Sequence, residues 1–195
     1  MILALQYYLT DSERAMLLAR LLADIEPSYR DDVILGLICQ PGTPTTKIVS
    51  DTIVHCSKKF PVIQACSTQG GKGWAAGSCK LWRGTILHFN ELFNSKKITH
   101  DCIFTFDGCD GVPLHRNWIE LLLAEHQVTR QKGKRVSGIL TVDNFDQPHI
   151  NGNMILDLLL PTEATVLLEQ PTDDMLATGA MWDVINGDMD AVFFP

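Results

Sequence analysis

The stretch that decides the fold reads VILGLIC and runs from Val33 to Cys39. Every residue in it is apolar or glycine, so a strand made from it leaves no face for water. Such unbroken apolar runs are typical of parallel strands, which helices cover on both faces. A strand with one wet face would alternate apolar and polar residues instead. The sequence therefore predicts that this strand lies inside a parallel sheet.

Strands and helices alternate on both sides of this run. Residues 2–8 predict a strand, and a helix follows with apolar residues at helical spacing as far as Pro27. Thr10 and Glu13 are expected to begin that helix as a capping box. Further strands are expected at 61–66, 102–106, 135–142 and 191–194, and helices at 45–56, 75–93, 117–127 and 173–185. This order predicts an α/β fold with a mostly parallel, doubly wound sheet, in a single domain spanning residues 1–195.

The composition excludes several classes of protein. Of the 195 residues, 46% are hydrophobic and 20% charged, which is enough apolar material for a core and unlike a disordered chain. No apolar run approaches the roughly 20 residues that span a bilayer, and residues 1–5 lack the basic start of a signal peptide. We therefore expect a cytoplasmic protein. The net charge of −7 gives no general attraction to nucleic acid. The six cysteines lack CxxC spacing and are expected to be buried free thiols.

The clearest chemical motif is FTFDGCDGVP, residues 104–113, in which a predicted strand delivers Asp107 and Asp110 into a glycine-flanked turn. Two nearby carboxylates repel each other unless a cation lies between them. Their oxygen ligands suit Mg²⁺ or Mn²⁺, which can also bind a diphosphate. The alternative is an acidic turn in which one aspartate caps the next helix. Ligands of doubly wound sheets bind beyond the carboxyl ends of the strands, which selects the loops at 8–11, 40–44, 67–74 and 107–113.

A strand that ends in an acid-rich turn, followed by Val112-Pro113 and a helix, resembles the DxD region of GT-A glycosyltransferases. The resemblance implies a Rossmann-like fold of the nucleotide-diphospho-sugar transferase type. It also implies that Asp107 and Asp110 hold Mn²⁺ or Mg²⁺ on the diphosphate of the sugar donor. Two residues separate these aspartates, where the family motif has one. Counted back from Val112-Pro113, Asp110 matches the second acid, the first falls on Gly108, and Asp107 is a shifted partner.

A glycine-rich segment, residues 70–80, supplies a second predicted part of the site. It opens a helix, so backbone N–H groups and the helix dipole can face an anion, and Lys72 and Lys80 add positive charge. It resembles the segment of GT-A enzymes that contacts the nucleotide or sugar. Thr10 and Asp11 are expected at the same donor, because their loop follows a strand at the same sheet edge. The alternative is a flexible loop with a solvated lysine, and the spacing of a P-loop is missing.

The segment from Asp146 to Asn153 carries side chains that suit a hydroxyl-rich sugar: His149, Asn151 and Asn153. It resembles the loop after the DxD motif that holds the donor sugar or the acceptor. The resemblance also makes His149 a candidate third metal ligand. The alternative is a turn in which asparagine and glycine adopt positive φ.

An acidic pair at residues 173–174 opens a predicted late helix. It resembles the position of the catalytic base in many GT-A enzymes, which makes Asp174 the candidate base for the acceptor hydroxyl. Capping of the helix by Asp173 is the alternative. Trp182, further along the same helix, is expected either to stack on a sugar ring or to lie in the core.

Together these features predict a glycosyltransferase that moves a sugar from a nucleotide-diphospho-sugar to an acceptor hydroxyl. The acceptor stays open among a glycan, a small molecule and a hydroxylated DNA base. One alternative is a nucleotidyltransferase of the same fold, whose usual glycine-rich signature is missing from residues 7–11. The other is a non-catalytic relative that binds nucleotide-sugars. The acid that the family commonly has after the second strand is also missing, since residues 40–42 read Gln-Pro-Gly, so the nucleotide base stays open.

Overall fold

The computed structural model of the chain describes residues 1–71, 76–106, 111–142 and 148–159. In these residues the strands are β1 (Ile2–Tyr7), β2 (Ile34–Cys39), β3 (Val62–Cys66), β4 (Cys102–Thr105), β5 (Val136–Val142) and β6 (Pro148–Asp157). The helical elements are the short 3-10 turn η1 (Leu9–Asp11), α1 (Ser12–Ile25), α2 (Lys47–Cys56), α3 (Ala76–Asn94) and α4 (Trp118–Gln131). The α/β class predicted from the sequence is confirmed. No helix in the described ranges is long and apolar enough to cross a membrane.

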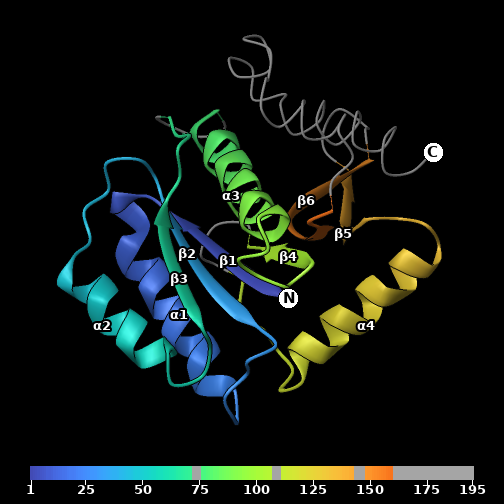
Figure 1. Cartoon of the computed structure of the whole chain (residues 1–195), viewed down its shortest axis with the longest axis horizontal. Helices are drawn as coiled ribbons and strands as arrows, with labels where there is room; N and C mark the ends of the chain where they lie inside the picture. The colour runs from blue at the N-terminus through green and yellow to red at the C-terminus, as the bar shows by residue number, and fades with distance from the viewer. Residues whose placement is uncertain (72–75, 107–110, 143–147, 160–195) are drawn as a thin grey trace.

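The described strands form one sheet in the order β3-β2-β1-β4-β6-β5 (Figure 1). β1 pairs in parallel with both β2 and β4, and β2 pairs in parallel with β3. β6 pairs antiparallel with both of its neighbours, β4 and β5. The sheet is thus mixed and mostly parallel, as in a Rossmann-like fold. The chain leaves β1 for β2 and β3 on one side and returns to β4 on the other. The strand order therefore reverses between β1 and β4, which is where open α/β sheets bind ligands.

Helices cover both faces of the sheet, and β1 supplies alternate residues to each. Leu3 and Leu5 belong to the core under α1, α2 and α4, whereas Ile2 and Ala4 belong to the core under α3. All four of these side chains are fully buried. This two-sided burial explains the unbroken apolar sequences of β1 and β2, because in a parallel sheet covered on both faces each strand residue lies in one core or the other.

Helix α3 approaches the sheet closely because two glycines leave room for it. The ring of Phe89 lies over Gly36 of β2, where an added Cβ would be 2.5 Å from the ring carbon Cζ. A Cβ added to Gly84 of α3 would lie 1.9 Å from the hydroxyl oxygen of Ser67, just beyond β3. Interiors packed at this density cannot absorb an extra methyl group without moving backbone. The two glycines therefore set how close α3 lies to the sheet.

A buried polar network ties α4 to the β5–β6 edge. His126 of α4, 1% exposed, has Nδ1 2.7 Å from the hydroxyl of Ser137 in β5 and Nε2 2.8 Å from the carboxylate of Asp157 in β6. Arg130 donates to Asp157 and to the exposed Asp101. Burial by itself would raise the pKa of Asp157, but hydrogen bonds from His126 and Arg130 outweigh it and lower the pKa. These contacts join α4 to both β5 and β6 and so anchor the helix at this edge of the sheet.

Two local predictions are wrong. The capping box at Thr10 does not form: Thr10 instead donates to the carboxylate of Asp11 at 3.2 Å, and the N-cap makes no side-chain bond. The 3-10 turn η1 occupies these residues, so α1 begins later, at Ser12. Residues 148–153, expected as a polar loop or turn, instead form the first part of β6. This segment pairs with β5 in the sheet. The pairing outweighs the weak strand propensity of asparagine and glycine. The elements expected at 173–185 and 191–194 lie outside the described residues.

The network around Asp157 predicts a loss of stability in acid. The lowered pKa means that the carboxylate contributes stability above its unfolded-state pKa, and that this contribution disappears as the pH falls through the folded-state pKa. We expect Asp157→Asn to cost about 3 kcal/mol near neutrality, because Arg130 and His126 lose their charged partner. The gap between wild type and variant should narrow below about pH 4. Urea unfolding across a pH series measures both quantities.

The matched control is Asp101→Asn. This carboxylate also accepts from Arg130, but its side chain is 55% exposed. Its removal should cost less than about 1 kcal/mol. Equal losses in the two variants, or a gap for Asp157→Asn that does not change with pH, would contradict the assignment of the network.

Candidate functional site

The carboxyl ends of the parallel strands gather three of the four loops predicted to form the site. After β2, Pro41 and Gly42 form a tight turn in which Gly42 has φ of 80° and the N–H of Thr43 donates to Gln40 at 3.1 Å. Pro followed by a residue with positive φ is the pattern of a type II turn. The turn leaves the Gln40 side chain free to donate to the carbonyl of Gly71 at 2.9 Å. The loop after β2 is thus bonded to the glycine-rich loop after β3.

Glycines let these loops approach one another. A Cβ added to Gly70 would lie 2.5 Å from the ring of Pro41. A Cβ added to Gly77, in the first turn of α3, would lie 2.9 Å from the carbonyl oxygen of Gly71 and 3.1 Å from the hydroxyl of Tyr8, the residue after β1. The ends of β1, β2 and β3 and the start of α3 therefore meet in one place.

Lys80 lies beside the glycine-rich loop. It belongs to the first turns of α3, is half-buried, and its Cδ would be 3.4 Å from a Cβ added to Gly71. The amino end of α3 and a lysine are thus directed at the same part of the sheet edge. The backbone N–H groups of a helix amino end, the helix dipole and an ammonium group together favour an anion such as a phosphate. The role predicted for Lys80 at the donor stays a prediction.

The acid motif itself, with Asp107 and Asp110, lies outside the described residues, but both ends of its loop are defined. At the entry, the N–H of Phe106 donates to the carbonyl of Ala4 in β1 at 3.3 Å. At the exit, a Cβ on Gly111 would lie 3.5 Å from Oδ1 of Asn153 and 3.8 Å from the ring of Phe106. The loop therefore leaves and returns at the point where the strand order reverses.

Asn153 reaches this point because β6 is antiparallel. Thr105, the last residue of β4, pairs with Met154. The residues just before Met154 therefore lie at the carboxyl end of β4. The side chain of Asn153 is half-buried there, beside Gly111. Asn153 thus lies beside the exit of the acid loop, in a strand and not in the predicted loop, and its role in binding a sugar stays a prediction.

The other predicted residues fall into three groups. Thr10 and Asp11 lie in η1, directly after β1 at the same edge. For His149 and Asn151 the structure describes only the backbone, within β6. Outside the described residues lie Lys72, Asp107, Asp110, Asp174 and Trp182.

The described side chains alone do not assemble a metal site: in that part of the chain, no group of three or more His, Cys, Asp or Glu is arranged to hold an ion. The side-chain oxygen next to the exit of the acid loop belongs to Asn153. An amide oxygen together with the carboxylates of Asp107 and Asp110 would be a set of hard oxygen donors. Such donors fit Mg²⁺ or Mn²⁺ and do not suit a soft metal.

The sequence pointed to the loop after β2 but not to Gln40, and it did not single out Gly77 for close packing. Both act by contacting residues that lie far away in the chain, which local patterns do not show. Trp82 was expected in the core, and it is 3% exposed there, with Nε1 donating to the hydroxyl of Thr105 at 3.4 Å. This bond joins α3 to the last residue of β4, directly before the acid loop.

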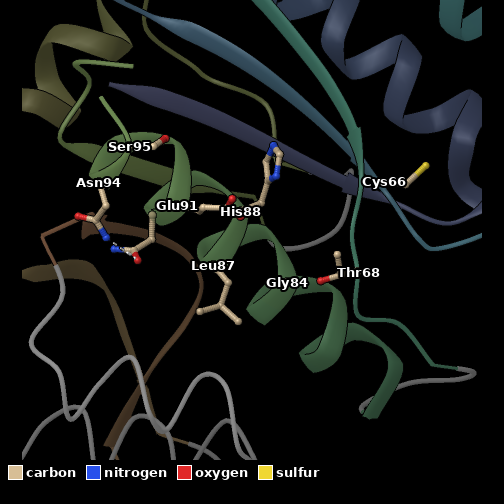
Figure 2. Close-up of a pocket in the computed structure, with 9 residues that line it drawn as sticks. Cys66, Thr68, Gly84, Leu87, His88, Glu91, Asn94 and Ser95 are labelled. Atoms are coloured by element: carbon tan, nitrogen blue, oxygen red, sulfur yellow. Dashed lines mark hydrogen bonds between the residues drawn. The ribbon is translucent and has the colours of Figure 1, made fainter. Parts of the chain in front are cut away.

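A cavity of about 580 Å³ lies along α3 (Figure 2). Thr68 and Gly84 line one end, and Glu91, Asn94 and Ser95 line the other. Within the described residues, Nε2 of His88 is buried there without a hydrogen-bond partner, and burial lowers the pKa of this imidazole. Thr68, from the loop at 67–74, lines this cavity, but the described side chains predicted to bind the donor or the sugar (Thr10, Asp11, Lys80 and Asn153) do not. We therefore place the candidate site at the sheet edge and not here.

Gly77→Ala tests whether the close approach of α3 holds the edge together. Alanine would gain up to about 1 kcal/mol in helix propensity. However, its methyl group would meet backbone atoms of Gly71, and relieving such overpacking costs about 1–3 kcal/mol. We expect net destabilisation in urea unfolding. Gly111→Ala is the control, because among the described residues its methyl group would meet atoms only at the ordinary contact distances of 3.5 Å and 3.8 Å. Unchanged stability in Gly77→Ala would contradict the packing described here.

Comparison with known proteins adds no family to this picture: no protein-family model matches the chain, and no curated protein matches it significantly. What the molecule can do has to be inferred from the chemistry of its sheet edge. That edge combines a helix amino end with Lys80, a loop bearing two aspartates, and the amide of Asn153.

Proposed function

We propose that this protein is a metal-dependent glycosyltransferase that moves a sugar from a nucleotide-diphospho-sugar to an acceptor hydroxyl. The observation that carries the proposal is the meeting of two features at one sheet edge. The amino end of α3 with Lys80 packs on the loops after β1, β2 and β3. The loop bearing Asp107 and Asp110 leaves from β4 and returns beside Asn153. An anion-binding helix end beside a pair of carboxylates suits a diphosphate bound together with a divalent cation.

In this proposal each part of the edge has a separate task. Asp107 and Asp110 would hold Mn²⁺ or Mg²⁺, whose positive charge would stabilise a leaving diphosphate. Lys80 and the N–H groups of α3 bind the same diphosphate from the other side, and Lys72 precedes that helix in the same loop. Thr10 and Asp11, after β1, contribute to the donor site.

The remaining predicted residues serve the sugar and the acceptor. Asn153, with Asn151 and His149 earlier in β6, offers hydrogen bonds to sugar hydroxyls, and His149 remains a candidate third metal ligand. Asp174 accepts the proton of the acceptor hydroxyl while that oxygen forms its bond to the anomeric carbon. Trp182 stacks on a sugar ring. The charge of −7 favours a sugar or small-molecule acceptor over a hydroxylated DNA base.

The first test of this proposal is the metal dependence of nucleotide binding. We expect UDP or GDP to bind only with Mn²⁺ or Mg²⁺ present and EDTA to abolish the binding, since two carboxylates alone repel a diphosphate. A thermal-shift panel of UDP-, GDP- and dTDP-sugars identifies the nucleotide, because a bound donor raises the melting temperature. Calorimetry then measures the affinity with and without metal.

Asp110→Ala should abolish the metal-dependent binding, and Asp107→Ala should weaken it. The reason is that Asp110 has the same spacing from Val112-Pro113 as the second acid of the DxD motif, whereas Asp107 is shifted by one position. Asp51→Ala is the control, since this exposed carboxylate on α2 pairs only with Lys47 among the described residues. Undiminished nucleotide binding in EDTA, or full transfer activity in Asp110→Ala, would sink the proposal.

A second test concerns the proposed base. Asp174→Asn should leave the affinity for donor and metal near that of the wild type, because the base contacts the acceptor and not the diphosphate. The transfer rate should fall by about 10²–10⁴, the usual contribution of a general base. The anomeric configuration of the product, read by NMR, should be inverted, since the hydroxyl attacks from the face opposite the diphosphate. A retained configuration would exclude this role for Asp174.

Asp173→Ala separates catalysis from helix capping. If Asp173 is an N-cap, its replacement by alanine costs about 0.5–2 kcal/mol of stability and leaves the transfer rate of the folded enzyme unchanged. A rate loss in Asp173→Ala equal to that in Asp174→Asn would contradict the assignment of the base to Asp174.

A further inference from the structure

The last rung of the ladder between β2 and β3 carries two cysteines. Cys39 and Cys66 are register partners at the carboxyl ends of these parallel strands, and their Sγ atoms are 2.8 Å apart. Register partners project from the same face of the sheet, and neighbouring strands lie about 4.8 Å apart. That spacing falls within the range of roughly 4.4–6.8 Å that disulfides span between Cα atoms. Both residues are free thiols in the structure.

The two thiols differ in access to solvent. Cys39 is 1% exposed, and its burial, together with the neighbouring Cys66, raises its pKa to about 12. Cys66 is exposed, which corrects the expectation that all six cysteines are buried. Its sulfur points away from α3 and from the cavity beside that helix (Figure 2). A dissolved oxidant therefore reaches Cys66 and not Cys39.

We propose that Cys39 and Cys66 form a reversible disulfide when the protein meets a hydroperoxide. Cys66 Sγ attacks the peroxide, the O–O bond breaks, and the products are a sulfenic acid at Cys66 and water or an alcohol. Cys39 Sγ then attacks the sulfur of Cys66, the S–O bond breaks, and water carries off the thiol proton. Two thiols and one hydroperoxide thus give one disulfide, one water and one further water or alcohol. A dithiol reverses the change by thiol–disulfide exchange.

The surroundings favour the second step. The sulfurs are already in contact, so the disulfide can form without a large displacement of either strand. Backbone pairing continues past the cysteines, with the N–H of Ser67 donating to the carbonyl of Cys39 at 2.8 Å.

The disulfide would connect two loops of the candidate site. Gln40 directly follows Cys39 and donates to Gly71, while the chain from Cys66 leads within a few residues to that same glycine. Oxidation would join the strand ends from which both loops start. The bond would also close a loop of the chain between β2 and β3, which restricts the unfolded state. This proposal does not depend on the glycosyltransferase activity, and its test measures thiols only.

The experiment is mass spectrometry after trypsin digestion. Cleavage at lysine and arginine releases residues 31–47 with Cys39 as their single cysteine, and residues 60–72 with Cys66 as theirs. The folded protein is treated with hydrogen peroxide, its remaining thiols are blocked with N-ethylmaleimide under denaturing conditions, and it is digested without reductant. We expect the two peptides linked, with a mass two hydrogens below their sum, and separated again by dithiothreitol. The oxidised protein should melt at a higher temperature than the reduced protein.

Variants make the test specific. Cys66→Ser changes an exposed side chain and should abolish the linked peptide while leaving Cys39 fully alkylated. Cys56→Ser, at a buried thiol on α2, is the matched control and should keep the linked peptide. The proposal is overturned if Cys66 oxidises to sulfinic acid while Cys39 stays free to alkylate, or if either thiol links instead to another cysteine.

Discussion

The position of α3 is the constraint on which the rest of this structure depends. The helix meets the sheet through glycines: Gly36 admits the ring of Phe89, Gly84 admits the hydroxyl of Ser67, and Gly77 admits the carbonyl of Gly71. The contact at Gly77 is with a backbone atom, which cannot move aside as a flexible side chain can, and the other two are with the buried side chains of Phe89 and Ser67. The helix therefore has little freedom to slide or tilt. Its amino end and Lys80 are held against the loops after β1, β2 and β3, and the bond from Trp82 to Thr105 extends the same support to the end of β4.

A reversal of chain direction completes the edge. If β6 ran parallel to β4, the residues before β6 would lie at the amino ends of the strands. The loop that follows β4 would lie at the opposite, carboxyl edge. Because β6 runs against β4, Asn153 arrives from its own strand at the place where β4 releases the acid loop. The network of His126, Asp157 and Arg130 holds the far end of this reversed strand against α4. The carboxyl end of β6 is thus held by the hydrogen bonds and ion pair of Asp157. Toward its other end, the strand places the amide of Asn153 at the candidate site.

The sequence was sufficient for the class of fold and for most strands and helices, because residues 2–7 and 33–39 are apolar enough to require cover on both faces. It also predicted that the loops after β1, β2 and β3 meet, since the carboxyl ends of parallel strands necessarily share one edge. What it missed is non-local. The strand character of 148–153 comes from pairing with β5, the start of α1 was displaced by a 3-10 turn, and neither the Gln40–Gly71 bond nor the Cys39–Cys66 register leaves a trace in local spacing. The assigned roles of Asp107, Asp110 and Asp174 rest on the sequence, because these residues lie outside the described ranges.

The pairing of β1 with β4 has a consequence during synthesis of the protein. Ile2 lies beside Ile103, so one side of β1 stays without its neighbour until the ribosome has made residues 102–105. β2 and β3 are complete by Cys66, and at about 5–20 residues per second the missing strand follows some 2–8 s later. For that interval the nascent chain presents an apolar strand edge, a surface that other chains can pair with. The order of elements along the chain therefore makes the interval between the synthesis of β3 and that of β4 the stage at which a chaperone would protect this edge.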